Sequence, residues 1–253
     1  MTGILRLRTM IGAGISVAVF MVWGFLLGAV LFPMVRLMSR RRARRIFHGQ
    51  VRLSWRIFCR IMEIIGAFSK IRVTGLHHIP EGRACMLVCN HLTLVDIVAL
   101  GSQVPNFNCV IRMNLWRHPF FGSVVRACDF IPNVGSDAFI EQCKQSFEER
   151  RPLIIFPQGE RTRPEMPLKF QRGAAQIAVR LDVDVLPVII DCTPLTMAKG
   201  MHWYNSPASP VLTLSIQPPL AVPKIITSDM PTPLKVRALT RYWEEYYISK
   251  IGA

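Results

Sequence analysis

The chain has 253 residues, of which 51% are hydrophobic, with a mean hydropathy of +0.30 and a formal net charge of +15 at pH 7. A chain of this length accommodates one large α/β domain, alone or with an anchor segment. The hydropathy is high for a soluble protein and indicates association with a membrane. Its seven cysteines are odd in number and include no C-x-x-C pair. Most of them stand among apolar residues, and together these features favour reduced thiols in a cytosol-facing domain.

The basic charge is concentrated in the N-terminal part of the chain. Residues 1–72 contain 13 Lys and Arg and a single acid, Glu63, whereas residues 73–253 contain 18 basic and 15 acidic residues. Basic charge next to an apolar segment suits anionic lipid headgroups, and a solvated run of charges is the alternative. The sequence shows no zinc-finger spacing, KH-type clamp or RNP-like aromatic motif, so we expect no nucleic-acid partner.

Residues 9–35 carry no charge, and the apolar stretch 10–32 is long enough to cross a bilayer or to enter it deeply. Two arginines precede this stretch and six follow it, so the positive-inside rule places the following domain in the cytoplasm. Several glycines and Pro33 permit a bend, which leaves an in-plane or re-entrant anchor open as an alternative.

Residues 51–68 predict a basic amphipathic helix. Arg52, Arg56 and Arg60 recur at four-residue spacing, and isoleucines fill another face of the same helix. Helices of this kind lie in membrane interfaces, although a helix packed against a core shows a similar pattern. We therefore interpret residues 1–69 as a membrane anchor.

From residue 70 onward the pattern alternates between strands and helices. Apolar runs predict strands at 70–75, 84–89, 107–111, 130–131, 153–156, 185–190 and 211–217. Helices are predicted at 95–104, 116–127, 137–150, 173–180 and 232–250. This alternation predicts an α/β domain over residues 70–253, built on a mostly parallel sheet with flanking helices.

The first motif with chemical content runs from Asn90 to Asp96 and reads N-H-L-T-L-V-D. Positions five apart diverge on one helix, so His91 and Asp96 meet only where the chain turns between them. The end of a predicted strand at Cys89 and the start of a helix near Thr93 supply such a turn. Asp96 can then hold the imidazole of a general base in one tautomer. Taken alone, however, a His and an Asp five apart are usually an accidental pair.

The second motif, F-P-Q-G-E-R-T-R, covers residues 156–163 and follows a predicted buried strand. Gly159 allows close approach of the backbone to a ligand. Arg161 offers a planar guanidinium fork that suits phosphate, and Lys169 and Arg172 add cations shortly afterwards. A surface turn with solvated charges is the alternative for this segment.

Together, in this order and spacing, the two motifs resemble those of the glycerolipid acyltransferase family, whose type member is lysophosphatidate (1-acyl-sn-glycerol-3-phosphate) acyltransferase. That family carries N-H-x4-D followed by F-P-E-G-T-R-S. The resemblance covers residues 70–220 and includes V-T-G at 73–75, P-F-F-G at 119–122 and L-P-V at 186–188. It implies an α/β acyltransferase domain on an N-terminal helical membrane anchor.

The resemblance also implies a role for each candidate residue. His91 is expected to be the general base and Asp96 the residue that orients it, with direct attack on the acyl thioester and no acyl-enzyme. A backbone N–H near Gly159 is expected to stabilise the oxyanion. Arg161 is expected to bind the acceptor phosphate. The further candidates for substrate binding are Thr162, Lys169, Arg172 and Arg112.

The function implied by the resemblance is transfer of a fatty acyl group from acyl-CoA or acyl-carrier protein to a lysophospholipid hydroxyl, for example on lysophosphatidate, giving phosphatidate. No cofactor and no metal ion are expected, and the expected partners are membrane lipids and the acyl donor. The expected location is a bacterial inner membrane, with the α/β domain on the cytoplasmic side. The sequence indicates no oligomeric state.

Three positions depart from the family pattern. Gln158 replaces the glutamate of F-P-E-G, Glu160 replaces the following threonine, and Asn133 stands where the family keeps a phosphate-binding arginine. A neutral Asn133 predicts weaker use of a phosphomonoester acceptor than a typical member shows. Two alternatives therefore stay open: an acyltransferase for a specialised or non-phosphate lipid, and a catalytically silent lipid-binding homologue.

Overall fold

The computed structural model describes residues 2–31, 40–119, 121–135, 137–162, 166–221 and 229–251. Its centre is a seven-stranded sheet with the order β1-β7-β6-β2-β5-β3-β4. The strands are β1 (Lys70–Thr74), β2 (Met86–Cys89), β3 (Asn108–Arg112), β4 (Ile131–Asn133), β5 (Leu153–Ile155), β6 (Val185–Thr193) and β7 (Val211–Ile216). All seven strands fall at predicted positions.

The sheet is mixed but mostly parallel, as the sequence predicted. Strands β6, β2, β5, β3 and β4 pair in parallel. Strand β7 pairs antiparallel with β6 and parallel with β1, so β1 and β7 run in the direction opposite to the other five strands. Because the five parallel strands end at one edge, the loops that follow them meet there, which is where open α/β sheets place their sites.

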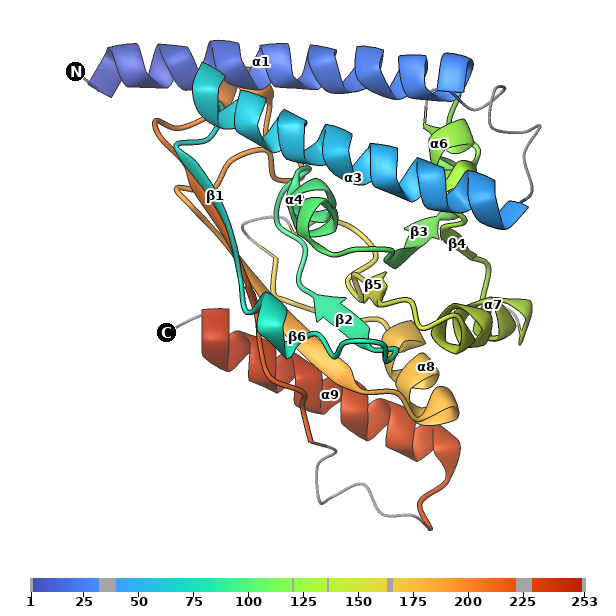
Figure 1. The fold of residues 1–253 in the computed structure, drawn as a ribbon. Helices are drawn as coiled ribbons and strands as arrows, with labels where there is room; N and C mark the ends of the chain where they lie inside the picture. Colours follow the sequence, from blue (N-terminus) through green and yellow to red (C-terminus); the bar gives the residue numbers. More distant parts are fainter. Residues whose placement is uncertain are drawn as a thin grey trace.

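Helices cover both faces of the sheet (Figure 1). They are α4 (Asp96–Gln103), α5 (Met113–Trp116), α6 (Gly122–Ala127), α7 (Asp137–Glu148), α8 (Gly173–Leu181) and α9 (Thr232–Ile251). One hydrophobic core joins the sheet to α4 and α6, and a second joins it to α7, α8 and α9. The helix predicted at 116–127 is divided into α5 and α6. Pro119 lies between them and lacks the N–H that a continuous helix requires.

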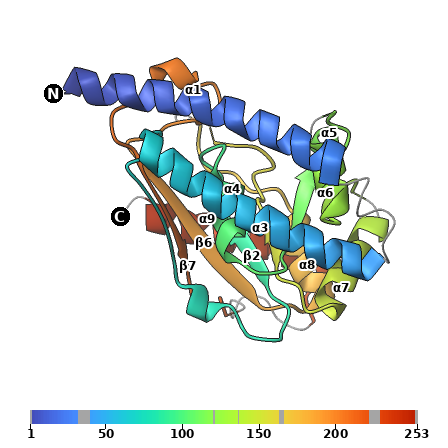
Figure 2. The same ribbon diagram turned by 45° about the horizontal axis from the view of Figure 1, so that its top comes forward.

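Two long N-terminal helices, α1 (Thr2–Leu26) and α3 (Arg40–Ile65), lie side by side across the domain (Figures 1 and 2). A π-helical turn at Leu27–Leu31 ends the first of them, and residues 32–39, which include the end of the predicted apolar stretch and Arg36, lie outside the described residues. Ala13 of α1 and Phe47 of α3 are buried in the same core as strands β6 and β7. The predicted anchor, residues 1–69, therefore packs into the same core as the α/β domain. Attachment of these residues to a membrane stays a prediction.

Two of the arginines on the predicted amphipathic helix bind another helix of the protein, which the sequence pattern did not indicate. Arg52 donates hydrogen bonds to the carbonyls of Ser102 and Gln103, and Arg56 donates to Ser102 as well. These carbonyls form the C-terminal end of α4, where unpaired acceptors and the helix dipole favour a cation. Arg60 pairs with Glu63 instead. The spacing of the three arginines thus partly reflects packing of α3 onto α4.

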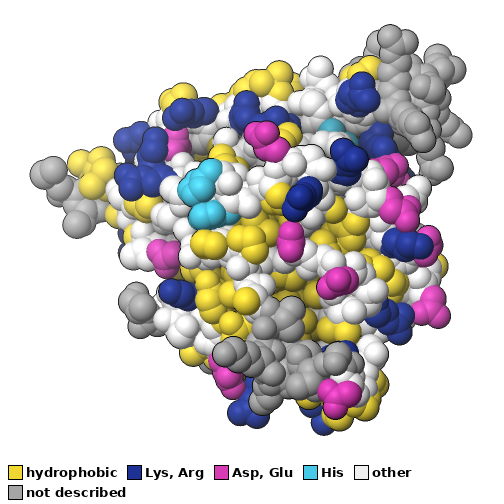
Figure 3. Space-filling model, turned by 60° about the horizontal axis from the view of Figure 1, so that its bottom comes forward, with side chains coloured by type: hydrophobic (Ala, Val, Ile, Leu, Met, Phe, Trp, Pro, Cys, Tyr) yellow, Lys and Arg dark blue, Asp and Glu magenta, His cyan; other side chains and the backbone are white. Residues whose placement is uncertain are grey.

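The surface of the α/β domain away from α1 carries charges of both signs. In Figure 3, which turns the underside of Figure 1 forward, basic and acidic side chains are interspersed among hydrophobic ones.

All seven cysteines are buried and unpaired. Burial raises the pKa of thiols such as Cys59 and Cys85 to about 12, so these thiols stay protonated and act as small apolar side chains.

Candidate active site

The two motifs meet at the carboxyl ends of β2 and β5, neighbouring strands in the centre of the sheet. Asn90, the first residue after β2, is fully buried, and its side-chain amide exchanges two hydrogen bonds with the backbone of Ile190 on β6. The side chain thus extends the ladder between β2 and β6 by one step. This contact places the next residue, His91, just beyond the edge of the sheet.

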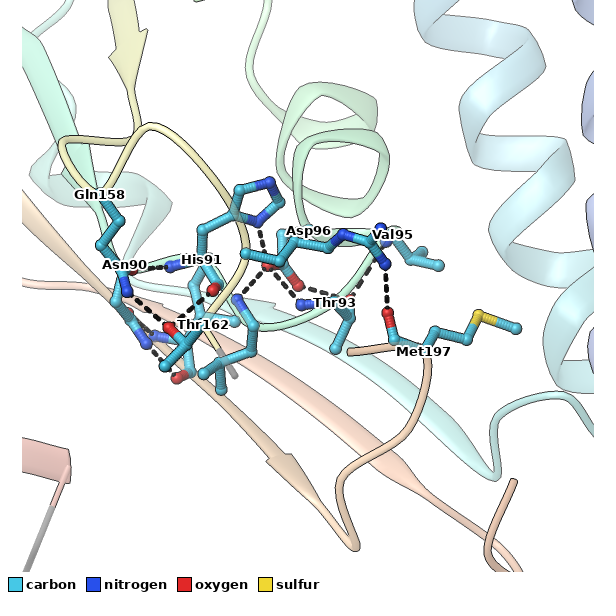
Figure 4. A network of polar contacts seen from close by, with 11 residues as sticks. Asn90, His91, Thr93, Val95, Asp96, Gln158, Thr162 and Met197 are labelled. Carbon is cyan, nitrogen blue, oxygen red and sulfur yellow. Dashed lines mark hydrogen bonds and ion pairs between the residues drawn. The ribbon is translucent and has the colours of Figure 1, made fainter. Parts of the chain in front are cut away.

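His91 and Asp96 form the hydrogen-bonded pair that their spacing predicted (Figure 4). The His91 Nδ1 atom lies 2.8 Å from Asp96 Oδ2, and the imidazole packs 4.4 Å, centroid to centroid, from the ring of Phe156. The chain turns between the two residues, because Asp96 opens α4 while His91 follows β2. An Nδ1 atom that faces a carboxylate leaves Nε2 as the ring nitrogen able to accept a proton.

Asp96 is fully buried, and the turn itself holds its carboxylate. Oδ2 accepts the backbone N–H groups of Leu92 at 2.7 Å and Thr93 at 2.9 Å, and Oδ1 accepts the hydroxyl of Thr93. With the bond from His91, the carboxylate accepts four hydrogen bonds, which compensate for its removal from water. Thr93, which lies near the predicted start of a helix, thus holds the carboxylate in place.

The second motif holds His91 through its backbone. The Gln158 Oε1 atom accepts the N–H of His91 at 2.6 Å, while its Nε2 donates to the hydroxyl of Thr162. That hydroxyl donates in turn to the carbonyl of His91 at 3.0 Å, and the N–H of Thr162 reaches the same carbonyl at 2.7 Å. Gln158 and Thr162 therefore clamp both polar groups of the His91 backbone (Figure 4). The sequence predicts Thr162 only as a further candidate for binding substrate and predicts no role for Gln158 in holding His91.

Arg161 lies beside the pair, half-buried, and its Nη1 donates to the carbonyl of Met197 at 2.7 Å. Burial lowers the pKa of its guanidinium and the nearby charge of Asp96 raises it. Leu94, in the His91–Asp96 turn, donates its N–H to the same Met197 carbonyl at 3.2 Å. A loop that follows β6 thus joins the two motifs, and no local sequence pattern indicated it.

Arg112 also reaches the second motif. Its Nη2 lies 3.1 Å from Oε2 of Glu160, and Lys199 binds the same carboxylate. These hydrogen bonds lower the pKa of Glu160. Arg112 is the register partner of Asn133 on β4, so it stands directly beside the position where the family keeps an arginine.

The remaining predicted ligands are less closely joined to the pair. Gly159 has a left-handed backbone with φ of 73°, which glycine adopts without strain, and its N–H donates to Phe156 within the turn. Its role toward an oxyanion stays a prediction. Lys169 and Arg172 are exposed beyond the motif, Arg172 directly before α8, and binding of substrate by them also stays a prediction. In the described parts of the chain, no cluster of His, Cys, Asp and Glu is placed to hold a metal ion.

Comparison with known proteins is consistent with this geometry. Over 148 residues the chain is 28% identical to the 1-acyl-sn-glycerol-3-phosphate acyltransferase of Helicobacter pylori, a match covering 55% of this chain and 62% of that protein. A putative enzyme of the same name from Caenorhabditis elegans is 31% identical over 134 residues, 49% of this chain and 47% of that protein. The matches thus span only part, about half to three-fifths, of these relatives.

The fold has a counterpart in a solved structure. The 1-acyl-sn-glycerophosphate acyltransferase of Thermotoga maritima superposes with a TM-score of 0.68 over 95% of this chain and 97% of that chain, at 22% identity. A profile of the Acyltransferase family matches residues 70–191, which include both motifs. Residues 70–191 therefore belong to the Acyltransferase family, as the two motifs predicted, and the chain is similar in sequence to 1-acyl-sn-glycerol-3-phosphate acyltransferases.

Proposed function

We propose that this protein is a membrane-bound acyltransferase that moves a fatty acyl group from a thioester, acyl-CoA or acyl-carrier protein, to the hydroxyl of lysophosphatidate or a similar lysophospholipid. The observation that carries the proposal is the His91–Asp96 pair, with its carboxylate held by four hydrogen bonds. The family to which residues 70–191 belong supports the same reaction.

The reaction follows from the free nitrogen of His91. Nε2 accepts the proton of the acceptor hydroxyl as its oxygen attacks the thioester carbonyl carbon, and Asp96 stabilises the resulting imidazolium. The tetrahedral intermediate collapses with cleavage of the C–S bond, and the imidazolium returns its proton to the departing thiolate. The products are the new oxygen ester and the free thiol, so no acyl-enzyme is required.

The acceptor phosphate is assigned to the cations around the pair. Arg161 lies close enough to Asp96 to interact with its charge, and its guanidinium suits a phosphate monoester. Arg112 stands in register with Asn133, so it can supply the positive charge that Asn133 lacks. Glu160 balances part of the charge of Arg112 and Lys199. A phosphate that displaces Glu160 from these cations gains both as partners.

We further propose that α1 lies in the plane of the membrane. It is the one helix of the described residues long and apolar enough to cross a bilayer. Yet it follows the domain surface: a Cβ on Gly12 would lie 2.8 Å from the backbone of Ala67, and one on Gly24 would lie 2.5 Å from the ring of Phe121. An upright helix would lose these contacts.

The opposite face of α1 is exposed and apolar. Its exposed side chains include Ile4, Leu7, Ile11, Ile15, Val22 and Phe25, and α3 adds Leu53, Ile57 and Ile64. We call these residues the membrane face. Arg6 and Arg8 are exposed on the same helix, and cations there suit anionic headgroups. For an in-plane helix the positive-inside rule carries less weight, so the cytoplasmic side of a bacterial inner membrane is supported mainly by the seven unpaired cysteines.

The test is turnover by the purified protein in anionic vesicles. A panel of lysophosphatidate, lysophosphodiesters and uncharged lyso-lipids is offered with both acyl donors, and products are identified by mass spectrometry. His91→Ala should fold normally and lower turnover by about 10²–10⁴. His77→Ala, on the exposed turn after edge strand β1, is the matched control. Full activity of a folded His91→Ala protein would refute the mechanism, and exclusive use of an uncharged acceptor would refute the phosphate assignment.

A further inference from the structure

The loop between β6 and β7, residues 194–210, exposes two large aromatic side chains. Trp203 is 50% exposed and Tyr204 is 45% exposed, both on the short 3-10 helix η3 (Trp203–Asn205). The ring of Tyr204 stacks on His202, with centroids 4.8 Å apart and planes 7° from parallel. Trp and Tyr combine an apolar ring with a polar group, the combination that proteins place at the boundary between lipid and water.

This loop adjoins α1. A Cβ on Gly14 would lie 3.1 Å from the ring of Trp203, so the indole packs against a bare patch of the helix backbone. The N–H of Ser209 donates to the hydroxyl of Thr9, also on α1, at 3.3 Å. In Figures 1 and 2 the orange segment that contains η3 lies beside α1 in both views. The exposed aromatic rings therefore border the membrane face.

The same loop reaches the candidate site. The carbonyl of Met197 accepts hydrogen bonds from Arg161 and from the N–H of Leu94, and Lys199 pairs with Glu160. A segment of fewer than twenty residues thus contacts α1 at one end and both catalytic motifs at the other. Any surface that binds Trp203 and Tyr204 is held at a defined position relative to Arg161.

We propose that Trp203 and Tyr204 are a second membrane anchor, which enters the headgroup layer of an anionic bilayer and sets the orientation of the site toward the lipid. The inference rests on the proposed function. A bilayer is favoured as the occupant because the two rings border the apolar row of α1, and because residues 1–72 carry 13 basic residues and one acid. A second copy of the chain is the competing occupant.

Binding to vesicles of phosphatidylglycerol and phosphatidylcholine tests the anchor. Tyr204→Ala should weaken binding about five-fold, because about half of one aromatic ring is left to be buried by lipid, and five-fold corresponds to about 1 kcal/mol. The matched control is Ile248→Ala, which removes an apolar side chain of similar exposure, 55%, from α9. Unchanged binding by Tyr204→Ala overturns the proposal, as does equal weakening by Ile248→Ala.

A second measurement, of fluorescence quenching, uses a variant that keeps an aromatic ring at position 203. Lipids brominated near the headgroup quench tryptophan fluorescence on contact, and Trp203→Phe should remove a measurable part of that quenching. If quenching is the same in wild type and Trp203→Phe, the proposal is wrong. Light scattering detects the competing occupant, since a dimer that Tyr204→Ala dissociates, with vesicle binding unchanged, assigns the surface to a second copy and also overturns the proposal.

Activity separates this inference from the proposed function. With a vesicle-embedded acceptor, Tyr204→Ala should raise KM about five-fold. With a short-chain acceptor dissolved in water, kcat and KM should equal those of wild type. Absence of turnover in wild type on every acceptor would refute the proposed function while leaving the vesicle-binding result to decide on the anchor. Equal loss on both kinds of acceptor would overturn the anchor, because Tyr204 would then act on the site itself.

Discussion

Gln158 offers a sharp test of how the site is held, because its two side-chain atoms do different work. Oε1 accepts the N–H of His91, and Nε2 donates to Thr162, whose hydroxyl passes a hydrogen bond to the His91 carbonyl. Gln158→Ala removes both contacts and leaves the half-buried N–H of His91 without its acceptor. Such a loss costs about 1–3 kcal/mol, and the lower value applies here because water can reach the group.

Gln158→Glu, which restores the residue of the family pattern, keeps an acceptor for His91 but cannot donate to Thr162. It should therefore cost less than alanine does, about 0.5–1 kcal/mol for one hydrogen bond. If the clamp keeps His91 in place during the reaction, turnover should fall about five-fold in Gln158→Ala and about two-fold in Gln158→Glu. KM for the acyl donor should stay unchanged.

The assay is kcat and KM for each variant, together with thermal unfolding. Thr162→Ser keeps the hydroxyl and serves as the matched control, whereas Thr162→Val breaks the relay. The double variant Gln158→Ala, Thr162→Val should lose less than the sum of the single losses, because both act on one chain of hydrogen bonds. Strict additivity, or wild-type turnover in Gln158→Ala, would refute the reasoning.

Three further predictions concern charge and packing. Arg161→Ala should lower kcat/KM for phosphate-bearing acceptors about 10–100-fold, because it removes charge-assisted hydrogen bonds; the same loss with an uncharged acceptor would contradict a phosphate-binding role. Burial and the charge of Arg151 lower the pKa of His48 to about 4, whereas the pKa is about 6.5 in the unfolded chain. The contribution of His48 to the free energy of unfolding is therefore fully present above pH 6.5, and about 3 kcal/mol of it is lost as the pH falls to 4. Urea unfolding of wild type and His48→Gln at both pH values measures this difference, and identical pH dependence would count against it. Gly12→Ala should lower the melting temperature because its Cβ meets backbone atoms at 2.8 Å, whereas Gly3→Ala, with nothing within 4 Å, should not.

The alternation of short apolar runs with amphipathic segments was enough to place all seven strands and to predict a mostly parallel sheet. Local patterns succeed here because strands buried between two helical layers are almost wholly apolar, as the burial of every residue of β2 and β5 illustrates. The pairing of His91 with Asp96 was also predictable. Both residues lie on one short turn, so six consecutive residues, 91–96, contain the whole geometry.

The sequence by itself determined the family, the fold class and the pair of residues to which we assign the chemistry. Only the tertiary structure decided what surrounds that pair: the Gln158–Thr162 clamp, the cap of α4 by Arg52, and the loop from Met197 to Trp203. It also laid α1 along the domain, and our proposal of an in-plane helix depends on that packing. The hydrogen bonds of Gln158 and Thr162 with His91, of Arg52 with α4 and of Arg161 with Met197 join residues 36 to 71 positions apart in the chain. Such distant pairings depend on how the whole chain packs, and no local period in the sequence encodes them.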